Sequence, residues 1–412
     1  MSRSIDERSL PWQASLALLL LATLAATAGA QPFPSQQLGL SADTSYQSHG
    51  LDQINLFNGQ LVLNLALGST YAAGPDLDYG LALSYNSNGW AHEERSCNAQ
   101  SYTLPVPRPR SNAGFGWALE VGRVLAPNEA ESGRWTFLSP DGGEHGFYTE
   151  LHPGYPSTPQ GNTWFSTDGS YLRLKRFPSG STQCASAVPA GLTADCLLLE
   201  MPDGTIHELR SFAAAGGGDY RLTQMRDRHG NAVDLEHPGA GTELRLRDGH
   251  GRLQRIIFDG PASGPQKVTR VELTSFGGAT ATYDFVYAQQ TLDRQGYLNP
   301  PACAEPGQVT VDVLQRIIQP DGSFYEMSYY TQDGAPEVLS GGLKSLRLPT
   351  RGEYRWTYTP ITFFSQDPAE TRAEWIRRAY GVATKEIFER FGQTTPLATW
   401  TYAYATSGPQ VP

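Results

Sequence analysis

Apolar and polar residues alternate most strictly between residues 61 and 85. Four leucines share one face of a strand that begins at Leu61, and a second apolar face follows between Leu77 and Tyr85. Period-two alternation over this length is typical of strands. It predicts a hairpin with one buried face and a loop over residues 68–76. Residues 86–112 lack the pattern and are predicted to form a loop.

A strand–turn–strand pattern then recurs along the chain. It fits residues 135–148, 197–210, 222–235 and 244–257. Two later copies align without a gap and share Leu, Pro and aromatic positions, at residues 314–329 and 343–358. In the last copy Thr-Arg-Gly replaces Asp-Gly-Ser, so we expect a different turn there. Repetition of one hairpin unit predicts an extended sheet or a solenoid.

Two turn sequences join these strands, Pro-Asp-Gly and Asp-x-His-Gly. Proline presets φ at the first turn position, aspartate bonds the backbone with its own side chain, and glycine accepts a positive φ. We therefore predict a structural role for an aspartate and a glycine in each of five turns: Asp141 and Gly142, Asp203 and Gly204, Asp227 and Gly230, Asp248 and Gly251, and Asp321 and Gly322.

The composition supports the same fold class. The 43 glycines, 29 prolines and 20 tyrosines favour many short strands and tight turns. We predict an all-β fold, an extended antiparallel sheet of repeated hairpins. One short helix is expected, with Asp367 as N-cap and Gly381 as its stop. Alternation over residues 399–404 predicts a terminal strand, and a polar tail follows it.

The first 30 residues are typical of a secretory signal. Arg3 and Arg8 precede an apolar run that ends in Ala28-Gly29-Ala30. The run is shorter than the ~20 residues that span a bilayer. We predict cleavage after Ala30 and a secreted or cell-envelope protein that does not span the membrane; an uncleaved anchor is the alternative. The net charge of −10 argues against nucleic acid or an anionic membrane as partner.

The cysteines suggest an oxidising compartment. Four cysteines allow three pairings. Cys184 and Cys196 flank a Pro-Ala-Gly turn signal and are predicted to staple a hairpin. Cys97 and Cys303 would then pair across the fold or stay free. Four unpaired thiols are the alternative, and none of the spacings fits a zinc site.

The sequence carries no recognised catalytic motif. Asp168 and the turn aspartates could pair as glycosidase carboxylates, but their turn positions favour turn formation. Four histidines are interpreted as exposed turn residues rather than metal ligands or general bases. We therefore predict no enzymatic activity and no catalytic, cofactor-binding or metal-binding residue. These histidines are His145, His207, His229 and His250.

Rows of tyrosine and tryptophan admit two interpretations. They suit stacking on sugar rings, and they equally suit cross-strand packing within a sheet. Alternation places the rings on the same face as leucine and methionine positions, which favours packing. Rings exposed in a row would instead favour carbohydrate binding.

Taken together, these motifs resemble the N-terminal stretch of bacterial RHS (YD-repeat) proteins. The resemblance covers most of residues 50–360. It rests on Ile54-Asn55-Leu56-Phe57-Asn58-Gly59-Gln60-Leu61, Leu83-Ser84-Tyr85-Asn86-Ser87-Asn88, Gly114-Phe115-Gly116-Trp117, Asp168-Gly169-Ser170-Tyr171-Leu172-Arg173, Pro202-Asp203-Gly204-Thr205, Asp227-Arg228-His229-Gly230-Asn231 and Asp248-Gly249-His250-Gly251-Arg252-Leu253.

The resemblance implies a large β-sheet that spirals into a partly closed shell, which encloses a toxin or presents a surface for contact with cells or glycans. The family's C-terminal core, self-cleaving aspartate site and toxin domain are not recognised in the sequence. We expect a shorter β-structure or a truncated relative of a larger protein. The expected parts are a signal peptide (1–30), an N-terminal β region (31–130), degenerate hairpin repeats (131–360) and a closing segment with the helix, terminal strands and tail (361–412).

The sequence thus predicts a secreted, non-enzymatic RHS-type scaffold, either a shell segment or a cell-surface interaction module. Its expected partners are other RHS segments or cell-surface glycans, and no cofactor is expected. A carbohydrate-binding module with exposed aromatics is the first alternative, and a glycoside hydrolase is a remote one.

Overall fold

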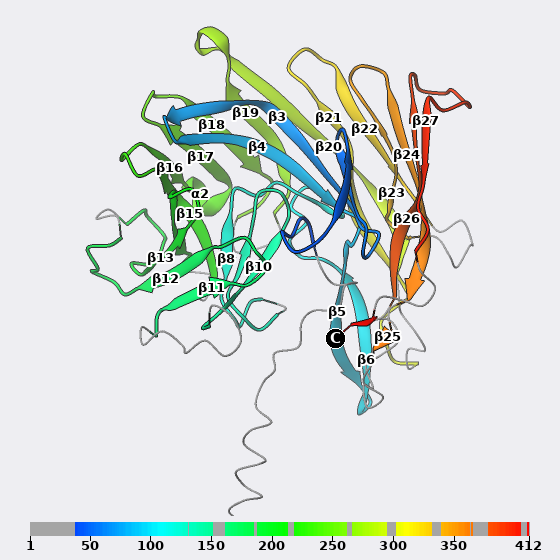
Figure 1. Ribbon diagram of the computed structural model, residues 1–412, viewed down its shortest axis with the longest axis horizontal. Coiled ribbons are helices and arrows are strands. Elements are labelled where there is room, and N and C mark those ends of the chain that lie inside the picture. Colours follow the sequence, from blue (N-terminus) through cyan, green and yellow to red (C-terminus); the bar gives the residue numbers. More distant parts are fainter. Residues whose placement is uncertain are drawn as a thin grey trace, which may run out of the picture.

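The fold is nearly all β in the computed structural model (Figure 1). The structure describes residues 38–130, 132–150, 161–184, 188–212, 218–261, 266–294, 302–331, 339–362, 364–365, 378–404 and 410–411. Within these ranges the helical elements are a single turn, α2 (Pro238–Gly241), and a 3-10 turn, η3 (Phe276–Gly278). The predicted all-β class, built of antiparallel hairpins, is confirmed.

The N-terminal part forms a five-stranded sheet in the order β1-β2-β3-β4-β7. The predicted hairpin is its centre, and Leu63 pairs with Tyr85 and Leu65 with Leu83. The first strand is longer than predicted, because it continues with bulges through most of the expected loop. The strands are β1 (Tyr46–His49), β2 (Asp52–Asn55), β3 (Leu61–Gly74), β4 (Leu77–Asn86) and β7 (Trp117–Ala118).

The loop predicted over residues 86–112 is wrong. A hairpin of β5 (Trp90–Cys97) and β6 (Gln100–Pro107) occupies most of it, and Figure 1 shows it projecting from the body. Asn98 and Ala99 form its tip with positive φ. The middle of β5 is charged and exposed, so the ribbon buries no continuous apolar face. Period-two alternation therefore gave no signal for it.

Eight strands of the next region close into a ring. Closure depends on β15, which pairs with β14 and, through Asp219 to Arg221, also with β8. The ring was not predicted. Its strands are β8 (Arg123–Leu125), β9 (Thr136–Leu138), β10 (Glu144–Tyr148), β11 (Thr163–Ser166), β12 (Arg173–Phe177), β13 (Cys196–Glu200), β14 (Ile206–Ser211) and β15 (Asp219–Arg226).

From β15 the chain runs on as an antiparallel meander in which each strand pairs with the next. The predicted repeat hairpins coincide with pairs of ring or meander strands. Beyond β15 the meander strands are β16 (Ala232–Glu236), β17 (Glu243–Asp248), β18 (Leu253–Phe258), β19 (Val268–Thr274), β20 (Thr280–Asp293), β21 (Gln308–Ile318), β22 (Phe324–Tyr329), β23 (Leu343–Arg347), β24 (Glu353–Thr362), β26 (Arg378–Phe388) and β27 (Ala398–Thr401).

The helix predicted from Asp367 to Gly381 is wrong at its C-terminal end. Gly381 lies in β26, where it pairs with Thr359 of β24. Tertiary strand pairing overrides the local capping signal there. The predicted N-cap and first turn lie outside the described residues. A short parallel pair, β25 (Phe364–Ser365) with β28 (Gln410–Val411), completes the chain.

The core lies between the N-terminal sheet and the inner face of the meander (Figure 1). Alternate meander residues such as Leu246, Ile256 and Val271 are fully buried and belong to the same apolar cluster as Leu63. The residues between them point outward and carry cross-strand ion pairs, as Arg255 does with Glu243 and Glu272. The N-terminal sheet thus covers the inner face of the meander. In the described part of the chain, no helix is long and apolar enough to cross a membrane.

Candidate functional site

The repeat turns are built as their sequences predict. In every one the aspartate Oδ1 accepts a hydrogen bond from the backbone N–H two residues on. The nitrogen-to-oxygen distances are 3.1 Å for Asp141, 2.8 Å for Asp203, 2.8 Å for Asp227, 3.0 Å for Asp248 and 2.9 Å for Asp321. The partner glycines have φ values of 84° at Gly142, 87° at Gly204, 85° at Gly230, 79° at Gly251 and 81° at Gly322. These carboxylates therefore serve the turns themselves.

Asp248 also connects the turn to the N-terminal sheet. Its Oδ2 accepts hydrogen bonds from the Tyr79 hydroxyl at 2.9 Å and from Arg252 Nε at 2.6 Å. Burial alone would raise the pKa of Asp248, but these hydrogen bonds outweigh it and hold the pKa below its ordinary value. The carboxylate therefore stays ionised and saturated with donors, which suits a structural contact better than acid–base chemistry.

The turn between β23 and β24 was expected to differ from the other repeat turns, but it does not. Despite its Thr-Arg-Gly sequence it has the same hydrogen bonds as the turn between β21 and β22: Arg351 N to Leu348 O matches Gly322 N to Gln319 O. Arg351 occupies the glycine position with φ 76°, where Gly322 has 81°. The expectation of a different turn is wrong, because the backbone of the hairpin fixes the geometry and forces the arginine into it.

His145 and Asp168 form the most enzyme-like pair among the described residues. His145 Nδ1 lies 2.7 Å from Asp168 Oδ2, and Ser170 Oγ donates to the other oxygen of the same carboxylate. Burial would raise the pKa of Asp168, but the hydrogen bonds from His145 and Ser170 lower it to about 2. In a nucleophilic triad the histidine must contact the serine. Here both contact the aspartate, so the arrangement differs from that of a nucleophilic triad.

The other histidines lie apart. His229 and His250 are exposed, as predicted, and His229 Nε2 lies 2.9 Å from Asp76. His145 is buried and His207 is largely covered, so the expectation of exposure is wrong for both. Burial lowers the pKa of His207 to about 4, which keeps its ring neutral. Within the described ranges, no three His, Cys, Asp or Glu side chains gather as a metal ion would require.

Most of the described tyrosine and tryptophan rings are buried in the core or half-buried against it. Trp117 Nε1 donates to the Tyr329 hydroxyl at 2.8 Å, and the Tyr85 hydroxyl accepts from Leu343 N at 2.8 Å. Burial raises the pKa of Tyr85 and of Tyr329, so both phenols stay neutral. These contacts join the N-terminal sheet to the meander. The strongly exposed aromatic rings are isolated on separate turns, such as Tyr171 at 80% and Phe276 at 100%.

A small cavity lies beside β15 and β17. Phe212, His237 and Gln266 are among its lining residues, and its volume is about 30 Å³. That volume holds one or two waters and is far below the ~300 Å³ of a small-molecule pocket. The cavity cannot hold a sugar ring.

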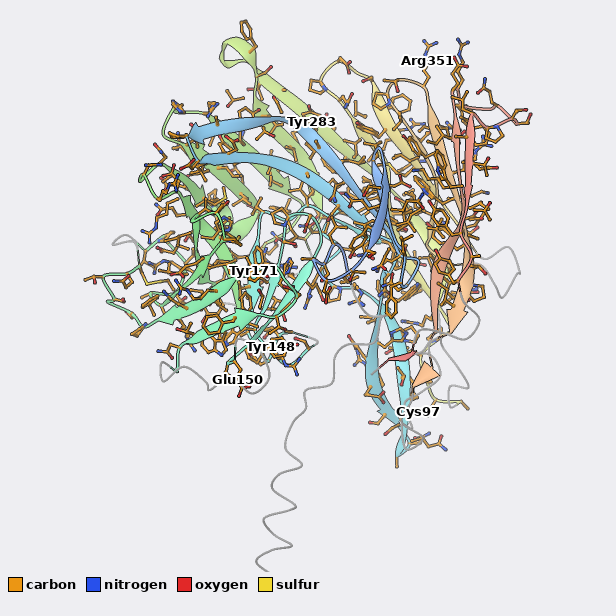
Figure 2. All side chains as sticks on the ribbon, in the orientation of Figure 1. Cys97, Tyr148, Glu150, Tyr171, Tyr283 and Arg351 are labelled. Atoms are coloured by element: carbon orange, nitrogen blue, oxygen red, sulfur yellow. A yellow bond between two sulfur atoms is a disulfide. The ribbon has the colours of Figure 1, made fainter. Side chains whose placement is uncertain are left out.

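Two disulfides cross-link the chain. Cys184 pairs with Cys196, as the turn signal between them suggests, and the two Cα atoms are 6.1 Å apart. Cys97 pairs with Cys303 across 206 residues. This second bond fastens the tip of the β5–β6 hairpin, labelled by Cys97 in Figure 2, to the segment between β20 and β21.

Neither a known family model nor a curated protein sequence matches the chain. Among solved structures it is similar to TcdB2-TccC3, with 12% identity and a TM-score of 0.35 over 85% of this chain and 20% of that one. It is also similar to the Photorhabdus luminescens Tc holotoxin pore, with 12% identity and a TM-score of 0.28 over 88% and 16%.

A third similar structure is the N-terminal domain of the effector protein SpvB from Salmonella typhimurium strain LT2, with 13% identity and a TM-score of 0.26 over 79% of this chain and 98% of that domain. The chain spans about a fifth of the TcdB2-TccC3 chain. Membership of the RHS family is a prediction from the sequence motifs.

Proposed function

We propose that the chain is an exported, non-enzymatic β scaffold of RHS type that acts as a shell segment or an interaction module. The observation that carries the proposal is the bonding of the repeat aspartates. Each of the five carboxylates bonds the backbone of its own turn. A scaffold needs such turns at regular intervals, whereas a hydrolase needs two carboxylates facing one substrate.

The remaining polar clusters support the same proposal. Asp168 is the shared partner of His145 and Ser170, and Asp248 is the shared partner of Tyr79 and Arg252. Both carboxyl groups have lowered pKa values. A general acid at neutral pH needs a raised pKa instead.

As partners we propose other RHS-type segments, which would extend a shell. Glycans are less well supported, because the exposed aromatic rings of the described residues are scattered rather than aligned. A sugar-binding platform needs rings that are exposed side by side.

A glycan-hydrolysis screen tests the non-enzymatic assignment. The wild-type protein and the Asp321→Asn variant are incubated with a panel of polysaccharides, and released reducing ends are measured. We expect no release from either protein. Hydrolysis by the wild type that disappears in Asp321→Asn would overturn the proposal, provided that both proteins have the same melting temperature.

A further inference from the structure

The turn between β23 and β24 holds a strained arginine. Arg351 adopts φ 76° at a position where the equivalent turn has glycine. A left-handed conformation is unfavourable for a residue with a Cβ atom, and such strain occurs most often at sites of function. Glycine would fit the turn without strain, so what arginine adds is its side chain. Figure 2 shows Arg351 at the outer end of the turn.

An exposed apolar group lies beside it. Phe391, in the turn between β26 and β27, donates its backbone N–H to the Arg351 carbonyl oxygen at 3.1 Å. Its side chain is 55% exposed, and Leu397 of the same turn is 69% exposed. The guanidinium of Arg347 lies over the Phe391 ring, 3.0 Å from its centroid. This stacking holds the ring in place while one side stays open to solvent.

Two exposed arginines lie in this group, although the protein as a whole is acidic. Arg351 and Arg390 are both exposed, and neither has a carboxylate partner among the described residues. Arg347 is already paired with Glu326. Glu389 is the exposed acidic neighbour of this group. The whole chain carries a net charge of −10, so these two unpartnered arginines stand out against the overall charge of the protein.

We infer that Arg351, Arg390, Phe391 and Leu397, here called the rim patch, bind an acidic protein segment that carries apolar side chains. Its carboxylates would pair with Arg351 and Arg390, and an apolar side chain would cover Phe391 and Leu397. Arginine and aromatic residues are enriched at the energetic centres of protein interfaces. Charge complementarity selects the acidic partner. This inference goes beyond the scaffold proposal and stands without it.

An anionic membrane is the competing partner, and the structure favours it less. Membrane binding by charge draws on a broad cluster of basic residues. The rim patch offers two unpartnered arginines, with Glu389 next to them and the exposed Asp321 on the neighbouring turn of the same sheet end. The remaining surface of an acidic protein would be repelled by anionic lipid.

Fluorescence anisotropy with a defined probe tests the inference. The probe is a short labelled peptide of alternating Glu, Leu, Asp and Phe, and the comparison peptide has Gln and Asn in place of Glu and Asp. We expect salt-sensitive binding of the acidic probe to the full chain. The double variant Arg351→Gly with Arg390→Gln should weaken binding about tenfold or more, which is the effect of losing charge-assisted contacts. Phe391→Ser should also weaken it.

Matched controls separate recognition from folding. Arg247→Gln removes an exposed arginine elsewhere, and Phe276→Ser removes the exposed ring of another turn; neither should change the affinity. Arg351→Gly introduces the residue that the equivalent turn has at this position. The melting temperature of this variant should therefore rise, while its affinity for the acidic peptide should fall. Absence of binding, equal binding of the neutral peptide, or unchanged affinity in the double variant would overturn the inference. So would binding only to vesicles of phosphatidylcholine with phosphatidylserine.

Discussion

Asp52 and Lys385 form a fully buried ion pair although 333 residues separate them in the chain. Each side chain is 1% exposed. Asp52 also accepts a hydrogen bond from Trp356 Nε1 at 3.1 Å. The pair joins β2 of the N-terminal sheet to β26 near the far end of the meander. The apolar core brings the two sheets together, and this pair links them inside it.

Removing one charge of this pair should destabilise the protein strongly. In Lys385→Met the carboxylate of Asp52 remains buried without its cation, which typically costs about 3–5 kcal/mol. Urea unfolding measures the loss. The double variant Asp52→Asn with Lys385→Met should recover part of it, because no uncompensated charge is left. If Lys385→Met lowers the free energy of unfolding by less than about 1 kcal/mol, the ion pair is not buried as described.

The repeat turns should tolerate a change of charge but not a change of backbone. Asp203→Asn and Asp321→Asn should be nearly neutral, because asparagine makes the same bond to the backbone N–H. Gly204→Val and Gly322→Val should each cost about 1–2 kcal/mol or more, since a β-branched residue at positive φ is strained. Thermal melts of the four variants give the comparison. The structural assignment fails if the asparagine variants lose more stability than the valine variants.

The hairpins could be predicted from the sequence because their information is local. Alternation between Leu61 and Tyr85 and the Asp-Gly turns each act over a few residues. Closure of the ring depends instead on β8 pairing with β15, about a hundred residues further along the chain. The β5–β6 hairpin buries no continuous apolar face, so alternation does not reveal it. Gly381 lies in a strand because β26 pairs with β24, although the local sequence suggests the end of a helix. These three features depend on contacts that the local sequence does not encode.

The same limit applies to the candidate sites. The turn aspartates were predictable because their side chains bond their own backbone. The strained backbone of Arg351 was not predicted, because the Thr-Arg-Gly sequence favours a different turn while the hairpin imposes the same geometry. The gapless alignment of the two repeats sets Arg351 opposite Gly322 and is the signal that points to this conformation. The pair of Asp52 with Lys385 arises only when two sheets meet.

The disulfides should stabilise different parts of the molecule. Closing the short loop between Cys184 and Cys196 should contribute about 3 kcal/mol through chain entropy. The bond of Cys97 to Cys303 instead tethers the exposed β5–β6 hairpin, so its replacement by serines should increase amide hydrogen exchange in β5 and β6 above all. Non-reducing peptide mapping should recover both bonds, and free thiols at Cys184 and Cys196 would end the proposal of a stapled hairpin.

Export should remove the first 30 residues. N-terminal sequencing of protein recovered from the periplasm or medium of an expressing bacterium should begin at Gln31. Replacing Ala28 and Ala30 by bulky residues should block this cleavage, because small side chains are required there. Recovery of the unaltered chain with Met1, only from the cytoplasm, would refute export.

Stability should fall as the pH drops from neutral towards 4. Burial lowers the pKa of His207 and of His237 to about 4, whereas an exposed histidine has a pKa of 6.5. Both rings are therefore neutral in the folded protein, and their contribution is complete above pH 6.5. Between pH 6.5 and about 4 only the unfolded chain takes up these protons, so the free energy of unfolding decreases with falling pH, by a few kcal/mol in all.

Urea unfolding at pH 7.5, 6 and 5 measures this decrease. A variant that cannot take up the protons, His207→Gln with His237→Gln, should have a flatter profile over the same range, whatever its stability at pH 7.5. The exposed His250 serves as the control, since His250→Gln should leave the slope unchanged. The lowered pKa of Asp168, about 2, does not interfere, because its stabilising effect is lost only as the pH falls below its ordinary value of 3.8. If the free energy of unfolding changes with pH by the same slope in the wild type and the double histidine variant, then folding does not lower the pKa values of the two rings.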